Sequence, residues 1–245
     1  MADKLLTDEL SAPLGGAATA KVDINTGAGN LTIDRLTTGE QVLARGRLQY
    51  FEKQGPPDCS ANSSSGQATL TLRGGDPGRA RFHFPWEACN GAYEWQIHIN
   101  PAVQSDITAR SGGGNVKLDL AGMAVTRLAA DTGGGNMDVV LPDSAANLSV
   151  IARTGAGNVT VDVGSSMTGS SAIEAGSGAG NVVVHLPRGL AARVHATSGM
   201  GKVIVDSRFS QVDRKTYQSP DYDSAVDKVD ITAHSGAGNV SVDVK

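Results

Sequence analysis

The chain repeats one short motif, Ser/Thr-Gly-x-Gly-Asn, seven times, and in one copy lysine replaces the asparagine. The copies are Thr26–Asn30, Ser111–Asn115, Thr132–Asn136, Thr154–Asn158, Ser177–Asn181, Ser198–Lys202 and Ser235–Asn239. From Asn115 to Asn181 the asparagines recur after 21, 22 and 23 residues. Such a period accommodates two or three short strands with their turns, which is one coil of a parallel β-solenoid.

Apolar and polar residues alternate on both sides of every motif. Around the fourth copy, Val150 and Ala152 precede the glycines, and Val159 and Val161 follow the asparagine. A period of two predicts a half-buried strand on each side of a sharp corner. Neighbouring coils lie about 4.8 Å apart, so equivalent side chains stack into columns. The chain is therefore predicted to be an all-β, right-handed parallel β-solenoid, similar to a β-helix, with coils of about 22 residues and a flanking, partly antiparallel segment.

The corner residues are predicted to have a structural role. Glycine accepts positive φ angles and close backbone contact, as a sharp bend requires. Stacked asparagine side chains can form hydrogen bonds from coil to coil and satisfy backbone groups at the bend. The predicted structural ladder consists of Asn30, Asn115, Asn136, Asn158, Asn181 and Asn239.

Two segments interrupt the repeats. Residues 1–20 are expected to lead into or cap the first coil, and residues 21–245 to form a single β-solenoid domain. The insertions in that domain lie at about residues 40–100 and 207–230. Within the first insertion, turns rich in Gly, Pro and Ser separate strands expected near 41–51, 67–73, 79–85 and 93–99.

Composition restricts the classes of partner and compartment. The formal net charge is −4, whereas nucleic-acid-binding surfaces need clustered Lys and Arg. No apolar run reaches the roughly 18 residues of a membrane span, and residues 1–10 lack the features of a secretory signal. Two compartments stay open: the cytoplasm, or an extracytoplasmic site reached through an upstream export or anchor segment.

Cys59 and Cys89 are the only cysteines, and both lie in polar surroundings typical of loops. They either form a disulfide, which would favour an oxidising compartment, or remain two free thiols.

Residues that could support catalysis or bind a metal do not form a recognisable site. An aspartate stands four residues after the end of the motif in five copies, at Asp34, Asp119, Asp162, Asp206 and Asp243. Val140 and His185 interrupt this column, so calcium binding is not predicted. The five histidines lack metal-ligand spacing, and neither a nucleophile elbow nor a cysteine beside a base is present. No enzyme activity, cofactor or metal site is therefore predicted.

The sixth copy departs most from the pattern. Met200 stands at a position of small residues, and Lys202 stands at the position of asparagine. Ile204 is expected on the outer face beside Val183 of the preceding coil, directly before the aromatic insertion. The candidate interaction patch consists of Val183, Ile204, Phe209, Tyr217 and Tyr222. Either residues 207–230 fold back and cover this patch, or the patch binds a partner.

The repeats and their flanking segments resemble a known family. The similarity rests on the extended motif Ser/Thr-Gly-x-Gly-Asn-Val-x-Val-Asp, on Ile97–Pro101 leading into Asp106–Arg110, and on Leu-Pro pairs at coil ends. Over about residues 20–245 the chain is similar to the bacterial putative adhesin family of toastrack-like β-solenoid repeat proteins. The resemblance implies a non-enzymatic, envelope-associated domain, and it brings no catalytic residues.

Three functional hypotheses follow. The first is a non-enzymatic domain for adhesion or sensing that binds an unidentified protein or glycan at the cell envelope. The second is a cytoplasmic scaffold that polymerises through its open coil ends, as bactofilin-like proteins do. The third is a polysaccharide-active β-helix enzyme that depends on Asp162 or Asp206. None of the three involves nucleic acid, and self-association is compatible with the first two.

Overall fold

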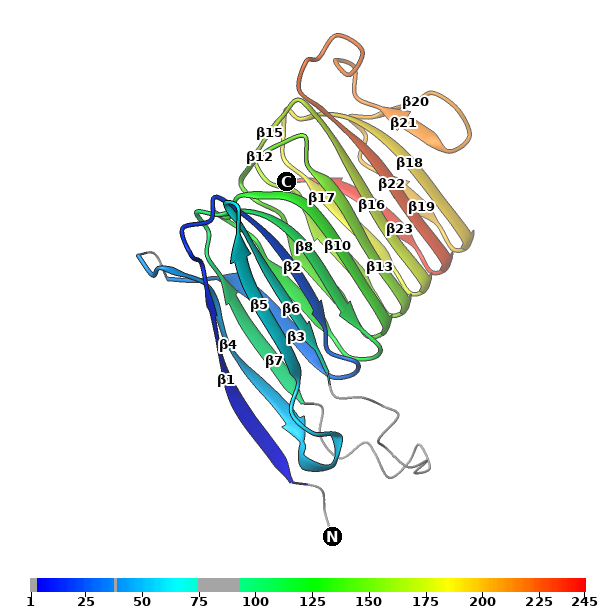
Figure 1. Ribbon diagram of the computed structural model, residues 1–245. Helices are drawn as coiled ribbons and strands as arrows, with labels where there is room; N and C mark the ends of the chain where they lie inside the picture. Colours follow the sequence, from blue (N-terminus) through cyan, green and yellow to red (C-terminus); the bar gives the residue numbers. More distant parts are fainter. Residues whose placement is uncertain (1–3, 38, 75–92) are drawn as a thin grey trace.

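The structure, a computed structural model, describes residues 4–37, 39–74 and 93–245. Its regular structure is almost entirely β-strand, arranged in sheets of ten, eleven and two strands. Successive coils contribute strands to both large sheets, so the molecule is built as a stack of coils (Figure 1). The predicted parallel β-solenoid is confirmed.

The ten-stranded sheet contains the strands that follow the seven glycine corners. In spatial order its members are β1 (Leu5–Pro13), β4 (Val42–Phe51), β7 (Glu94–Ile99), β3 (Asn30–Arg35), β9 (Val116–Asp119), β11 (Met137–Val140), β14 (Val159–Asp162), β17 (Val182–Leu186), β23 (Val240–Val244) and β19 (Val203–Val205).

The eleven-stranded sheet contains the strands that precede the corners. In spatial order its members are β20 (Ser210–Gln211), β21 (Thr216–Gln218), β18 (Ala191–Met200), β22 (Lys228–Ala237), β16 (Ser170–Ala179), β13 (Ser149–Ala156), β10 (Val125–Gly134), β8 (Gln104–Ser111), β2 (Thr19–Asn25), β6 (Gln67–Arg73) and β5 (Asp58–Ser64). The small sheet pairs β12 (Ser144–Ala146) with β15 (Ser166–Thr168), and a short 3₁₀ helix, η1 (Glu52–Gln54), follows β4.

Equivalent residues of neighbouring coils pair in parallel and in register. Leu128 of β10 lies beside Ile107 of β8 on one side and Val150 of β13 on the other. All three side chains are buried between the two large sheets. Each fully buried aliphatic side chain contributes about 1.5–3 kcal/mol to stability, so these columns form the core.

The order of the coils in space differs from their order along the chain. The coil of β2 and β3 lies between β6–β7 and β8–β9, and the coil of β22 and β23 lies between β16–β17 and β18–β19 (Figure 1). Ser241 of β23 therefore pairs with Val183 on one side and with Ile204 on the other. The expected position of Ile204 beside Val183 is wrong, because the final coil separates them.

Antiparallel strands flank both ends of the stack. At one end, β4 and β1 extend the ten-stranded sheet beyond β7, and β5 extends the other sheet beyond β6. At the other end, β21 and β20 continue the eleven-stranded sheet beyond β18. Strands β4, β6 and β7 match the segments expected near 41–51, 67–73 and 93–99, whereas the segment near 79–85 lies outside the described residues.

Candidate functional site

The ladder asparagines lie in one column along a corner of the solenoid. In each step the side-chain Oδ1 of one asparagine accepts the backbone N–H of the next coil, at 2.8–3.0 Å. The spatial order is Asn30, Asn115, Asn136, Asn158, Asn181, Asn239 and finally Lys202, whose N–H donates to Asn239 at 2.9 Å. The column therefore places Lys202 at the end of the stack.

A second ladder, which the sequence analysis did not identify, runs beside the asparagines. In six of the seven motifs the opening Ser or Thr donates its hydroxyl to a glycine carbonyl of the preceding coil in space, whereas the Thr26 hydroxyl has no partner among the described residues. Ser111 donates to Gly29 at 3.0 Å, and Ser235 donates to Gly180 at 2.7 Å. Except for the half-buried Ser198, these hydroxyl donors are almost fully buried, so the bond satisfies a polar group that would otherwise be costly to bury. The sequence signal for this ladder was the presence of Ser or Thr at the first position of all seven copies.

The segment between β19 and β22 is anchored to the end of the stack through Tyr222. This residue is 4% exposed, and the Arg193 guanidinium lies over its ring, with the guanidinium carbon 4.3 Å from the ring centroid. Lys228 approaches the same ring at 5.1 Å. The hydroxyl donates to Asp230 at 2.6 Å. Burial, and secondly this hydrogen bond, raises the pKa of Tyr222 to about 12.

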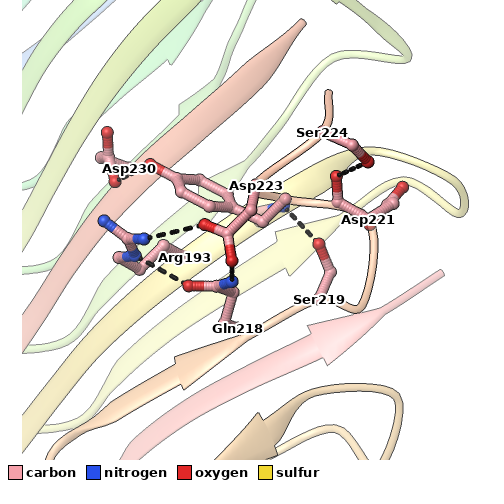
Figure 2. Close-up of polar contacts among 9 residues, drawn as sticks. Arg193, Gln218, Ser219, Asp221, Asp223, Ser224 and Asp230 are labelled. Carbon is pink, nitrogen blue, oxygen red and sulfur yellow. Dashed lines mark hydrogen bonds and ion pairs between the residues drawn. The ribbon is translucent and has the colours of Figure 1, made fainter. Parts of the chain in front are cut away.

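Arg193 and its neighbours hold the loop after β21 in place (Figure 2). Arg193 donates to Gln218 at 3.0 Å and to Asp223 at 3.4 Å, and Gln218 donates to the second oxygen of Asp223 at 2.8 Å. The buried hydroxyl of Ser219 accepts the N–H of Ala192 at 2.9 Å. This closed network of Arg193, Gln218 and Asp223 fixes the loop to β18.

The other aromatic residues of the segment cover part of the core at this end. Phe209 is 7% exposed, and the Arg208 guanidinium lies over its ring at 4.5 Å. Arg208 also donates to the carbonyl of Leu190 at 2.9 Å. Burial lowers the pKa of Arg208, and the charges of Asp221 and Asp206 partly oppose that shift. Tyr217 of β21 lies opposite Val194 and is partly buried against the core.

The structure does not bring the five residues of the candidate interaction patch together on one exposed surface. Phe209 and Tyr222 are buried, and Val183 is separated from the end of the stack by the final coil. Ile204 remains 54% exposed, with Met200 nearby in the chain at 73%. The segment therefore covers the end of the core but leaves the outer face of β19 open.

A shallow pocket of about 410 Å³ lies where this segment meets β15 and the turn before β18. Its lining includes Met167, Arg188, Leu190, Asp221 and Val226. Among the described residues, no three His, Cys, Asp or Glu side chains are arranged to bind a metal ion. The pocket offers a small mixed surface rather than a set of convergent catalytic groups.

Charged residues form two short rows on the outer face of the eleven-stranded sheet. In one row, Lys21, Asp106 and Arg127 lie side by side on β2, β8 and β10. In the other, Asp131 lies between two arginines, Arg110 of β8 and Arg153 of β13. The basic side chains are exposed, whereas both aspartates are half-buried. The rows join residues from distant motifs, so only the register of the sheet reveals them.

Two further sequence predictions concern the cysteines and the membrane. Cys59 is an exposed residue of β5, whereas Cys89 lies outside the described residues, so their pairing stays a prediction. In the part of the chain that the structure describes, no helix has the length and apolar character needed to cross a membrane.

One of two similar solved structures supports the fold. A putative cell adhesion protein from Clostridium sporogenes is 21% identical to this chain. The similarity covers 99% of this chain and 100% of the Clostridium protein, and the two structures superpose with a TM-score of 0.68. A putative adhesin from Bacteroides fragilis is 13% identical over 98% of both chains, with a TM-score of 0.35. At 21% identity the first similarity establishes the fold alone.

Comparisons with sequences establish the family. No curated protein is similar enough to this chain to count as a match. A family model described as the N-terminal domain of toast_rack, DUF2154, matches residues 2–162, which is more than half of the chain. The glycine corners, the stacked coils and this match agree, and the chain belongs to the toast_rack N-terminal domain family.

Proposed function

We propose that the protein is a non-enzymatic binding domain for adhesion or sensing at the cell envelope, and that it binds its partner through the outer face of the eleven-stranded sheet. The names of the Clostridium and Bacteroides proteins are consistent with an adhesive role. An anionic glycan or an acidic protein surface fits the chemistry of this face.

The observation that carries the proposal is a pair of exposed cations, Lys21 and Arg127, held at a fixed separation on the sheet. Neighbouring strands lie about 4.8 Å apart, so Lys21 and Arg127 stand about 10 Å apart on either side of Asp106. Neither of these cations has an ion-pair partner among the described residues. Backbone hydrogen bonds in the sheet hold their Cα positions, so a repetitive anionic partner could bind without reordering the protein.

Binding measurements on variants of this face test the proposal. The purified chain is passed over immobilised acidic glycans and envelope fractions, and retention is measured by biolayer interferometry. The Lys21→Glu/Arg127→Glu double variant should lose most of the binding, because like charges would then face the ligand. Lys117→Glu, on the outer face of the other sheet, is the matched control. Equal loss in both variants, or no binding by the wild type, would contradict the proposal.

The scaffold hypothesis is less well supported by the ends of the stack. A second solenoid that added coil on coil would need a free strand edge in both sheets. Strands β21 and β20 occupy that place beyond β18, and β5 occupies it beyond β6. Polymerisation by simple continuation of the coils is therefore disfavoured.

The enzyme hypothesis is less well supported by the positions of its two aspartates. In the stack, His185 and Asp243 stand between the coils of Asp162 and Asp206. Three coil steps correspond to about 14 Å, whereas paired glycosidase carboxylates lie about 5–9.5 Å apart. Asp162 also forms an ion pair with Lys245.

A further inference from the structure

The ten-stranded sheet ends at β19 with an open edge. Among the described strands, β19 pairs only with β23. The carbonyl of Lys202 and the N–H of Asp206 bond to β23, each at 2.9 Å. Because backbone groups alternate between the two edges of a strand, those of Val203 and Val205 point away from β23. These groups are ready to pair with another extended segment.

The end of the stack forms a step beside this edge. The eleven-stranded sheet continues beyond β18 with β21 and β20, while the ten-stranded sheet stops at β19. Tyr217 of β21 lies on the inner side of the step and is only partly buried. The step leaves room for added strands in the ten-stranded sheet, although β21 blocks a complete second coil.

The opposite end of the same sheet is extended by two antiparallel strands. Strands β4 and β1 extend the sheet beyond β7 as an antiparallel pair, and the beginning of β1 projects past the neighbouring coils (Figure 1). The carbonyl of Lys4 accepts the N–H of Glu52 at 2.9 Å, so the backbone of even-numbered residues faces β4. The backbone groups of Leu5 and Thr7 therefore face the open edge of β1.

The two open edges are complementary in sequence. Both contain a lysine, three intervening residues and an aspartate, as Lys202–Asp206 and as Lys4–Asp8. In antiparallel pairing with Ile204 opposite Leu6, Lys202 faces Asp8 and Asp206 faces Lys4. In this register Val203 pairs with Thr7 and Val205 with Leu5, the residues whose backbone groups are free on each edge. Opposite charges across a strand pair are favourable.

We propose that a second copy of the chain docks its β1 edge onto β19, so that copies associate head to tail. The contact would bury Ile204 and Leu5, which are 54% and 45% exposed in the single chain. At the position of Ile204 other coils carry polar residues such as Thr32, Lys117 and Asp138. The apolar Val183 at this position is half-buried inside the stack, whereas Ile204 is exposed on the edge strand. A heterologous contact of this kind generates rings or open filaments.

Charge reversal with rescue tests the contact in the full-length chain. Molar mass is measured by light scattering and sedimentation over a wide concentration range, and the wild type should rise above the mass of one chain. Lys202→Asp and Asp8→Lys should each weaken association about tenfold, because each places like charges opposite one another. The Lys202→Asp/Asp8→Lys double variant restores opposite charges and should recover association.

A control variant and the opposing outcomes complete the test. Lys117→Asp changes an exposed lysine in the middle of the same sheet and should leave association unchanged. Far-UV circular dichroism and thermal melting establish that each variant is folded. A wild type that remains a single chain at all concentrations would overturn the proposal. That result would indicate that Lys202 prevents pairing at the open edge. Failure of the double variant to recover would overturn it as well.

Discussion

Each asparagine of the ladder accepts a backbone hydrogen bond from the coil that follows it in space rather than from its own coil. The Oδ1 of Asn158 accepts the N–H of Asn181 at 2.9 Å, and Asn239 does the same for Lys202. The coil of Lys202 is the last in the stack, so an asparagine there would have no N–H to accept. This explains the single exception to the motif, which appeared in the sequence as an unexplained substitution.

Removing one rung of the asparagine ladder should have a measurable cost. Asn158→Ala leaves the N–H of Asn181 without its acceptor and should lower the free energy of unfolding by about 1 kcal/mol, measured by urea denaturation. Lys202→Ala, at the end of the ladder, should change stability by less than about 0.5 kcal/mol. Similar losses in both variants would show that the side-chain acceptor is unimportant.

The glycines of the corner differ in how much they are needed. At Gly135 the φ angle is 123°, and an added Cβ would lie 2.3 Å from the carbonyl oxygen of Gly114. At Gly134 an added Cβ would meet nothing closer than 4.0 Å. Alanine already occupies the position equivalent to Gly134 in other copies, such as Ala156. Close stacking of backbones therefore requires glycine at only some positions of the motif.

Alanine at these two positions should give opposite results. Gly135→Ala combines a strained φ angle with a clash against fixed backbone, and it should cost about 3 kcal/mol or more. Gly134→Ala should leave the free energy of unfolding within about 0.5 kcal/mol of the wild type. Chemical denaturation of both variants measures the difference, and a tolerated Gly135→Ala would contradict the tight stacking of coils.

At the scale of elements, the segment between β19 and β22 depends on one aromatic anchor. The Tyr222 ring contacts both Arg193 and Lys228, and its hydroxyl donates to Asp230. Ser219 joins the same segment to Ala192. The aromatic content of this insertion indicated a special role, and most of that content covers the end of the core. The choice between covering and binding could not be made from sequence, because both need the same apolar residues.

The Tyr222 hydroxyl should make stability depend on alkaline pH. Its pKa is about 12 in the folded chain and about 10 when unfolded. The neutral phenol therefore contributes stability fully below pH 10, and this contribution is lost as the pH rises from about 10 to about 12. The loss should approach about 2 kcal/mol.

Tyr222→Phe isolates this effect in urea titrations at pH 8, 10 and 11. The variant should be less stable by about 1 kcal/mol at pH 8, because it lacks the bond to Asp230. It should then lose less stability than the wild type as the pH rises. Tyr217→Phe is the control, because the Tyr217 hydroxyl makes no hydrogen bond to the described residues. Parallel pH profiles for wild type and Tyr222→Phe would contradict the assignment.

At the scale of the whole molecule, both ends of the repeat region lie inside the stack. The coil of β22 and β23 pairs on both sides, although it is the final segment of the chain. The exposed end is instead the coil of β18 and β19, which occurs earlier in the sequence. Position along the chain therefore does not indicate which coil is exposed at an end of the stack.

Hydrogen exchange of the intact protein should follow the spatial order of the coils. Amides of Ile231 and Val242 in the final coil should exchange as slowly as that of Val150 in the middle of the stack, because all lie in strands paired on both sides. In the single chain, at concentrations below association, amides of Val203 and Val205 at the open edge should exchange much faster. Mass spectrometry of peptic fragments measures both, and rapid exchange across residues 228–244 would contradict the insertion of the final coil.

The sequence by itself determined the strands, the corners and the columns of like residues. These features follow from local chemistry: alternation selects the buried face, and glycine permits the bend. Only the tertiary structure decided which coil lies beside which, and with it the charged rows and the open edge of β19. The physical reason is that every ladder coil offers its neighbours nearly the same backbone and asparagine groups, so no single repeat specifies its partner.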